Sequence, residues 1–236
     1  MTRRRWIADK LQGDRAFLRG QNAHHLARVL RAKVGQEFDI VCDGTVRLGR
    51  ITAVADDEVA FDLGAEVPQA ETRPITLLLA VFKFDRMEWA IEKATELGVA
   101  AIQPVIARRT DAHLAHAAGK RAERWRRIAH EAAQQSRRLS PPAIAEPVKL
   151  KEALTPEGTR ILLAESTAET TLAKALESVA PGSLVLAVGP EGGWAEEELS
   201  AFRAAGWTFA SLGDTILRAE TAAIAALAVA SAFPQK

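Results

Sequence analysis

The sequence predicts an α/β fold, in which a parallel sheet forms the larger, second part of the chain and a small β-rich domain precedes it. The first observation is the apolar run Leu184–Val188, which has the length and composition of a strand buried on both faces. The second is the order strand, helix, strand over residues 75–105, which is typical of a parallel sheet. The third is a set of short strands before residue 72.

Residues 1–72 are expected to form the first domain. Asp43-Gly44 is a hairpin signal, because both residues tolerate the left-handed backbone of a two-residue turn. A short helix is expected ahead of this turn, from His24 to Arg31. The proline-bounded segment Pro68–Pro74 is typical of a linker, so the second domain covers residues 73–236. The expected strands of the first domain are Val34–Val41, Val46–Val54 and Val59–Leu63.

The second domain is expected to alternate strands and helices. In the helix Arg86–Leu97, Trp89 lies off the apolar stripe, which indicates a second buried surface such as a subunit contact. The expected strands are Ile75–Phe82, Val99–Val105, Ile161–Glu165, Leu184–Val188 and Thr208–Leu212. The expected helices are Arg86–Leu97, Lys120–Arg138, Ala195–Ala205 and a last helix with Glu220 at its N-terminal tip.

The strand Leu184–Val188 runs into a glycine turn and then a helix, which is where open α/β sheets bind ligands. A phosphate-binding loop would need Lys-Ser/Thr after its last glycine, and Trp194-Ala195 stand there instead. Pro190 and Glu191 disrupt the dinucleotide-binding spacing. A tight turn without a ligand is as good an interpretation of this stretch alone. A bound ligand would be neutral or cationic near Glu191, and main-chain groups would contact it.

A second glycine-containing loop, residues 212–218, leads into the last helix. In a helical projection, Glu220 falls on the apolar face of that helix. A carboxylate on a buried face requires a partner, and Arg218 is the nearest candidate. A structural ion pair that complements the helix dipole would account for the same residues.

The two stretches together, G-P-E-G-G-W and L-G-D-T-I-L-R-A-E-T-A, resemble the ribosomal RNA small subunit methyltransferase E family of SPOUT-class enzymes. The segment Glu131–Arg138 also resembles that family's E-Q-[SC]-G-R motif, with Arg137 in place of the glycine. Thr215 and Ala195 replace the arginine and serine that are usual in the family. The resemblance implies a C-terminal trefoil knot, a PUA-like β-barrel as first domain, and a homodimer.

The resemblance also implies the function and the site. The expected reaction is methylation of N3 of a uridine in small-subunit (16S) rRNA, with S-adenosylmethionine as cofactor. Arg218 is the candidate that stabilises charge on the base, and Glu220 either orients Arg218 or accepts the proton. The expected cofactor-binding residues are Glu165, Ala187, Gly189, Pro190, Glu191, Gly192, Leu212, Gly213, Ile216, Leu217 and Arg218.

Charge is distributed unevenly along a chain whose net charge is only +1. Residues 1–50 hold 11 Lys/Arg against 5 Asp/Glu, which indicates a polyanionic partner. Solvated surface charge is the alternative interpretation. The candidate RNA-binding residues are Arg3, Arg4, Arg5, Arg28, Arg31 and Arg138. Two other functions stay open: a SPOUT enzyme that methylates another RNA such as tRNA, and a non-catalytic RNA-binding factor in ribosome assembly.

Several classes of protein are disfavoured. A single cysteine, Cys42, and the lack of an N-terminal apolar segment favour a cytoplasmic protein. The longest apolar tracts are too short to span a bilayer. No carboxylate or cysteine stands at metal-ligand spacing from His24, His25, His113 or His116, so no metal is expected.

Overall fold

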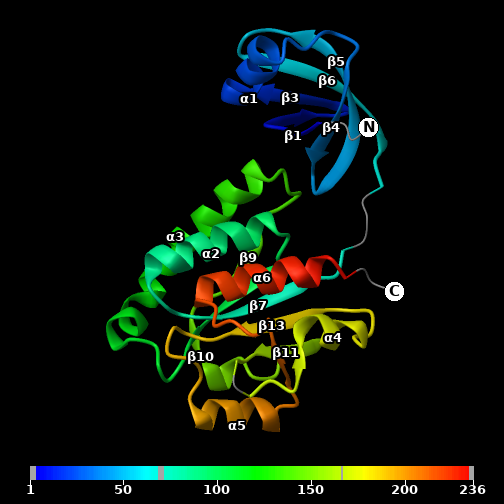
Figure 1. Ribbon diagram of the computed structural model, residues 1–236. Helices are drawn as coiled ribbons and strands as arrows, with labels where there is room; N and C mark the ends of the chain where they lie inside the picture. The colour runs from blue at the N-terminus through cyan, green and yellow to red at the C-terminus, as the bar shows by residue number, and fades with distance from the viewer. Residues whose placement is uncertain (1–3, 69–71, 166, 234–236) are drawn as a thin grey trace. The chain divides into compact units, whose positions relative to one another are not determined.

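The computed structural model describes residues 4–68, 72–165 and 167–233. The chain divides into two compact units (Figure 1). The first unit holds residues 1–71 and also 137–140. The second unit holds residues 72–136 and 141–236. The four residues 137–140 therefore pack with the first unit, although they follow directly on a long helix of the second.

The first unit is a six-stranded sheet with the order β1-β4-β5-β6-β3-β2. The predicted hairpin is confirmed: Asp43 and Gly44 have φ values of 46° and 76°, and Cys42 pairs with Thr45 across the turn. All neighbours in the sheet are antiparallel except β1 and β4. The strands are β1 (Arg5–Ile7), β2 (Lys10–Gln12), β3 (Arg15–Arg19), β4 (Glu37–Cys42), β5 (Thr45–Val54) and β6 (Glu58–Glu66).

The helical segment of the first unit differs from the expected helix His24–Arg31. It begins earlier, as α1 (Gly20–His24), and continues as one π-helical turn, η1 (His25–Val29). The N–H of Leu30 donates to the carbonyl of His25, five residues back, which is the π-helical pattern. Leu26, buried among the sheet residues, anchors this turn. The segment ends because Arg31 takes a left-handed conformation, φ 51°.

The second unit is a parallel sheet with the order β10-β8-β7-β13-β11-β14-β12, and β9 pairs with β8 beside it. Its strands are β7 (Ile75–Ala80), β8 (Ala101–Ile106), β9 (Ala143–Ile144), β10 (Val148–Lys149), β11 (Thr159–Leu163), β12 (Thr170–Thr171), β13 (Leu184–Val188) and β14 (Thr208–Ser211). Its helices are α2 (Phe84–Glu96), α3 (Ala112–Gln135), a 3-10 turn η2 (Leu150–Glu152), α4 (Leu172–Glu177), α5 (Glu196–Ala204) and α6 (Ala219–Ser231).

Helices cover both faces of this sheet (Figure 1). Residues of α2, α3, α4 and α6 form one core with Leu184, Leu186 and Val188 of β13. Val185 and Ala187 point to the other face, into a second core with Trp194 and the residues of α5. All five residues of β13 are buried, so the predicted strand with two covered faces is confirmed.

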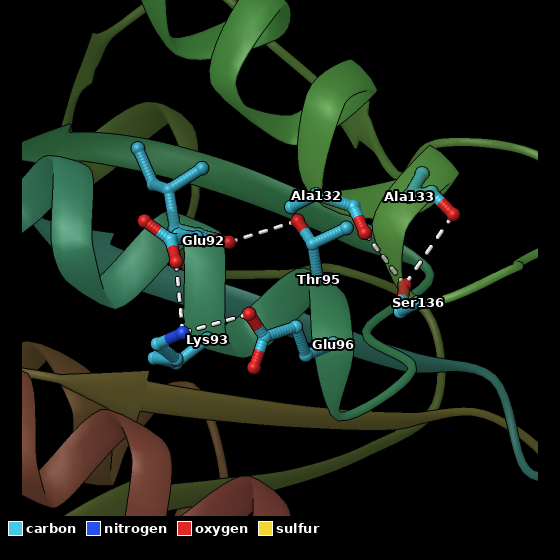
Figure 2. A network of polar contacts seen from close by, with 8 residues as sticks. Glu92, Lys93, Thr95, Glu96, Ala132, Ala133 and Ser136 are labelled. Carbon is cyan, nitrogen blue, oxygen red and sulfur yellow. Dashed lines mark hydrogen bonds and ion pairs between the residues drawn. The ribbon is translucent and has the colours of Figure 1, made fainter. Parts of the chain in front are cut away.

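Helix α3 begins eight residues before the expected start and ends three residues before the expected end. It begins at Ala112 because the side chain of Asp111 accepts a hydrogen bond from the N–H of His113, which caps the first turn. At the other end, the Ser136 hydroxyl donates to the carbonyl of Ala132 at 2.7 Å (Figure 2). The next residue, Arg137, has φ 58°, and this left-handed residue terminates the helix.

Two structural findings bear on membranes and metals. Over residues 4–68, 72–165 and 167–233, no helix combines the length and the apolar character that a membrane crossing requires. In the same part of the chain, no three His, Cys, Asp or Glu side chains are grouped as a metal ion would require.

The left-handed backbone of Arg137 generates a stability prediction. A left-handed residue other than glycine costs roughly 1 kcal/mol. The Arg137 guanidinium also lies over the Trp6 ring, 5.7 Å from its centroid. Arg137→Gly should relieve the backbone cost, whereas Arg137→Ala should keep it, and both variants remove the guanidinium from the ring. We expect the glycine variant to unfold about 2–4 °C above the alanine variant in a thermal scan. Equal melting temperatures would contradict the assigned conformation.

Candidate functional site

Three loops leave the same edge of the parallel sheet. Strand β11 pairs with β13 on one side and with β14 on the other, and all three run in the same direction. Their carboxyl ends therefore lie side by side, and the loops that begin at Ala164, Gly189 and Leu212 follow from that edge. This edge is the usual ligand site of open α/β sheets. The candidate cofactor residues, distant in the sequence, are brought together by these pairings.

The candidate cofactor residues differ in how much of each is accessible. Ala187 is fully buried, its methyl group belongs to the core on the α5 face, and its strand is paired on both edges, so it presents no exposed surface to a ligand. Ile216 is 83% exposed, an unusual state for an isoleucine. Pro190 is buried, and Gly189, Leu212 and Leu217 are partly buried. The exposed candidates are Glu165, Glu191, Gly192, Gly213, Ile216 and Arg218.

Three aromatic side chains, packed edge-to-face, support the turn after β13. A Cβ atom on Gly189 would lie 3.0 Å from Nε1 of Trp194, so close packing, and not a positive φ, favours glycine there. Trp194 packs edge-to-face on Phe202, with ring centroids 4.9 Å apart, and Phe202 packs in the same way on Trp207. Gly193 has φ 69° and donates its N–H to the carbonyl of Pro190 at 2.8 Å.

The loop after β8 clamps the glycine turn, an interaction that sequence reasoning missed. The Arg109 guanidinium donates to the carbonyl of Gly192 at 2.8 Å. Glu198 accepts from the N–H of Arg108 and from the N–H of Ala195, both at 2.8 Å. The second of these bonds caps α5, where Ala195 has no side-chain oxygen to do so. The sequence places two consecutive arginines soon after β8, but no local pattern relates them to Gly192, 83 positions away.

The prediction that Arg218 is the partner of Glu220 was wrong. Glu220 is 6% exposed, and its Oε1 lies 3.3 Å from a guanidinium nitrogen of Arg86, in the first turn of α2. Arg218, two residues before it, is exposed instead. Proximity in the sequence pointed to Arg218, but α6 packs against α2, and this tertiary contact decides the pairing. The structure thus gives no ion pair between the two candidate catalytic residues.

The described candidate RNA-binding arginines all belong to the first unit. These are Arg4, Arg5, Arg28, Arg31 and Arg138, while Arg3 lies outside the described residues. Arg28 forms a short ion pair with Asp56, and this hydrogen bond and charge raise the pKa of Arg28. Burial lowers the pKa of Arg138. Arg4 and Arg31 are exposed.

A hollow in the first unit is lined by one of these arginines, Arg4, and by both neighbours of another, Arg31. It has a volume of about 440 Å³, and the two neighbours of Arg31 that line it are Leu30 and Ala32. Phe38 adds an aromatic surface and Glu37 a carboxylate to the same hollow. A positive charge beside an aromatic ring is a feature of single-stranded nucleic-acid sites.

Known protein families match both units. Residues 69–231 match the family described as an RNA methyltransferase domain, and residues 18–63 match the RNA methyltransferase PUA domain. The ribosomal RNA small subunit methyltransferase E of Synechocystis is 35% identical over 220 residues, which cover 89% of this chain and 70% of the relative. The Mycobacterium bovis protein of the same name is 34% identical over 230 residues and covers 91% and 85%.

A solved structure extends the similarity to three dimensions. It is the ribosomal RNA small subunit methyltransferase E of Neisseria gonorrhoeae bound to S-adenosyl methionine, with a TM-score of 0.72 and 29% identity. The match covers 97% of this chain and 96% of the other. The α/β fold with a parallel sheet and a PUA-like domain is therefore shared with that protein. With two relatives above 30% identity over most of their length, the chain belongs to the ribosomal RNA small subunit methyltransferase E family.

Proposed function

We propose that this chain transfers a methyl group from S-adenosylmethionine to N3 of a specific uridine in 16S rRNA. The observation that carries the proposal is the meeting of three loops at one sheet edge in a member of this family. The relative from Neisseria gonorrhoeae binds S-adenosyl methionine, and its fold matches this chain over nearly its whole length. The resemblance to the family carries the choice of N3 and of uridine.

The residues at this edge fit the cofactor. An adenosine needs apolar contact and main-chain hydrogen-bonding groups. Ile216 offers an exposed aliphatic side chain, and Gly192 and Gly213 expose main chain without a Cβ atom. Glu165 and Glu191 are exposed carboxylates, which suit a ligand with a positive charge. In this proposal these residues, with Leu212 and Leu217, hold the cofactor, and Ala187 lies in the strand that leads into the glycine turn.

The chemistry requires help from the protein, because N3 of uracil carries a proton and is weakly nucleophilic at neutral pH. S-adenosylmethionine, when bound, supplies an electrophilic methyl group on a sulfonium. Arg218 donates hydrogen bonds to the uracil oxygen atoms, where negative charge develops as N3 loses its proton. Glu220 is the candidate acceptor of that proton. The loop residues align N3 with the methyl group and exclude water.

In this proposal the first domain binds the RNA and the second domain transfers the methyl group. Residues 1–72 form the RNA-binding domain, in which Arg3, Arg4, Arg5, Arg28 and Arg31, with Arg138 from residues 137–140, contact phosphates. Residues 73–236 form the methyltransferase domain. A base inside a duplex cannot reach the sheet edge, so the target uridine must be unpaired or flipped out of its stack.

The proposal includes a SPOUT-type trefoil knot, a homodimer and action in the cytoplasm during ribosome biogenesis. The knot is carried by the resemblance to the family, and it agrees with the position of β13, which pairs between β7 and β11 although both precede it in the chain. The homodimer is supported by Trp89, which is 47% exposed on α2, and by the exposed Ile216. Because the proposed substrate is the small subunit, the reaction would take place in the cytoplasm.

Mass spectrometry of the RNA tests the function directly. Small subunits from a strain that lacks the protein should gain one 3-methyluridine per 16S rRNA when the purified chain and S-adenosylmethionine are added. Methylation of tRNA instead would favour the alternative substrate. Binding to small subunits without cofactor binding in calorimetry would favour the assembly factor.

Replacement of Arg218 tests the assigned chemistry. If its guanidinium stabilises charge that develops only in the transition state, Arg218→Ala should lower kcat about a hundredfold or more. The affinity for S-adenosylmethionine, measured by calorimetry, should change less than about threefold, because the main chain of the loop remains. Full activity of the variant on purified small subunits would place the catalytic group elsewhere.

The hollow of the first unit gives a prediction about RNA binding. The double change Arg4→Ala with Arg31→Ala should flatten the salt dependence of RNA affinity by roughly 0.7 to 0.9 of a slope unit for each phosphate that the variant no longer binds. Arg15→Ala is the control, because Arg15 already lies 3.5 Å from Asp62. Titrations at several salt concentrations measure both slopes. Equal slopes for the wild-type chain and the double variant would show that Arg4 and Arg31 carry ordinary surface charge.

A further inference from the structure

Glu220 holds a carboxylate oxygen that nothing in the described residues satisfies. The side chain is 8% exposed, its Oε1 contacts Arg86 at 3.3 Å, and its Oε2 is shut from solvent without a hydrogen-bond partner. An unsatisfied buried polar atom costs about 1–3 kcal/mol, and more when the group is charged. Native structures keep few such atoms, and each calls for a missing partner or a functional reason.

Other buried polar atoms without partners are of a different kind. Within residues 4–68, 72–165 and 167–233 they are indole nitrogens of Trp6, Trp125 and Trp194, the hydroxyl of Thr167, and guanidinium nitrogens of Arg73. Glu220 alone among them is an acid, and it alone offers an oxygen that can only accept a hydrogen bond while ionised. It also directly follows the loop that carries Ile216 and Arg218.

Arg86 occupies a position where a positive charge is unfavourable. It is the third residue of α2, where the partial positive charge of the helix N-terminus repels a cation. Its side chain is 30% exposed and makes a single contact with the carboxylate, not a bidentate one. Glu220, the second residue of α6, is by contrast favoured by the dipole of its own helix. The cost at Arg86 is offset by its contact with Glu220.

We propose that Arg86 is a positioning residue for methyl transfer, and this proposal rests on the function proposed above. Arg86 contacts Oε1 of Glu220 and so fixes the orientation of the carboxylate. Oε2 then remains as the acceptor for the N3–H of the target uracil. The proton moves from N3 to Oε2, the bond from N3 to the methyl carbon forms, and the bond from sulfur to that carbon breaks with its electron pair retained by sulfur. Arg218 acts separately on the uracil oxygens.

Because Oε2 is shut from solvent, it can meet the base only after a local movement, which RNA binding would have to cause. The four residues 213–216 that lead toward α6 are all exposed, and few buried contacts oppose a displacement of this segment when RNA binds. Because Glu220 pairs with Arg86 and not with Arg218, we do not assign it the role of orienting Arg218. The two candidate catalytic residues therefore work on different atoms of the same base.

Four variants test the proposal: Arg86→Gln, Arg86→Lys, Glu220→Gln, and the double variant of Arg86→Gln with Glu220→Gln. Arg126→Gln is the control, because Arg126 forms an exposed ion pair with Glu146, at 2.7 Å, that does not involve Glu220. Each variant is characterised by thermal unfolding, by calorimetry with S-adenosylmethionine, and by kcat and KM on unmethylated small subunits.

We expect Arg86→Gln to lower kcat about tenfold or more, with KM and cofactor affinity changed less than about threefold. Arg86→Lys should recover much of the missing rate, because an ammonium can replace a single contact. The double variant should be no slower than Glu220→Gln alone, since Arg86 has no carboxylate to position once Glu220 is replaced. The control should keep the wild-type kcat.

Two results would overturn the proposal. One is a wild-type kcat in Arg86→Gln, or a fully additive loss in the double variant, which would leave only a structural ion pair. The other is a cofactor affinity that falls more than tenfold in Glu220→Gln, which would place Oε2 against the cofactor and not the base. If the wild-type chain methylates a different RNA, the same variants are compared on that RNA. The proposed substrate and the role of Arg86 are thereby judged separately.

Discussion

The fold depends on the insertion of β13 between two strands that precede it in the chain. Its five residues pair in register with β7 on one edge, and Leu184–Ala187 pair with β11 on the other. Because both faces of β13 are buried, its main-chain groups have no access to water and must be satisfied by these neighbours. The same pairing orders β13, β11 and β14 side by side, and this order brings the candidate cofactor loops to one edge.

Features encoded by neighbouring residues could be predicted from the sequence. The apolar run at Leu184–Val188 and the Asp43-Gly44 turn were predicted with the correct boundaries, because burial on two faces and a left-handed turn each leave a local pattern. The start of α3 was missed because its first turns, Ala112–Gly119, have no strong apolar period. The capping bond from Asp111 and the packing of Ala118 and Ala122 set that start.

The candidate site was predictable as a set of loops, and less so as a set of contacts. The glycines and Arg218 stand in motifs, so sequence alone places them in loops after strands. Arg86 and Glu220 are 134 positions apart, and no local pattern relates them. The clamp from Arg109 to Gly192 spans 83 positions and was missed for the same reason. Strand order, which decides both contacts, is a tertiary property of the whole sheet.

Residues 137–140 determine how the chain can be divided into separate domains. They pack with the first unit, yet they sit in the middle of the second unit's sequence. A gene cut near residue 72 would therefore express a first unit without this segment, and Trp6 would be deprived of the guanidinium of Arg137 that lies over its ring. The fragment that begins after this cut would still contain residues 137–140, which belong to the first unit. Separation into two independent fragments therefore requires that this tetrapeptide be grafted onto the first unit, because simple truncation removes it.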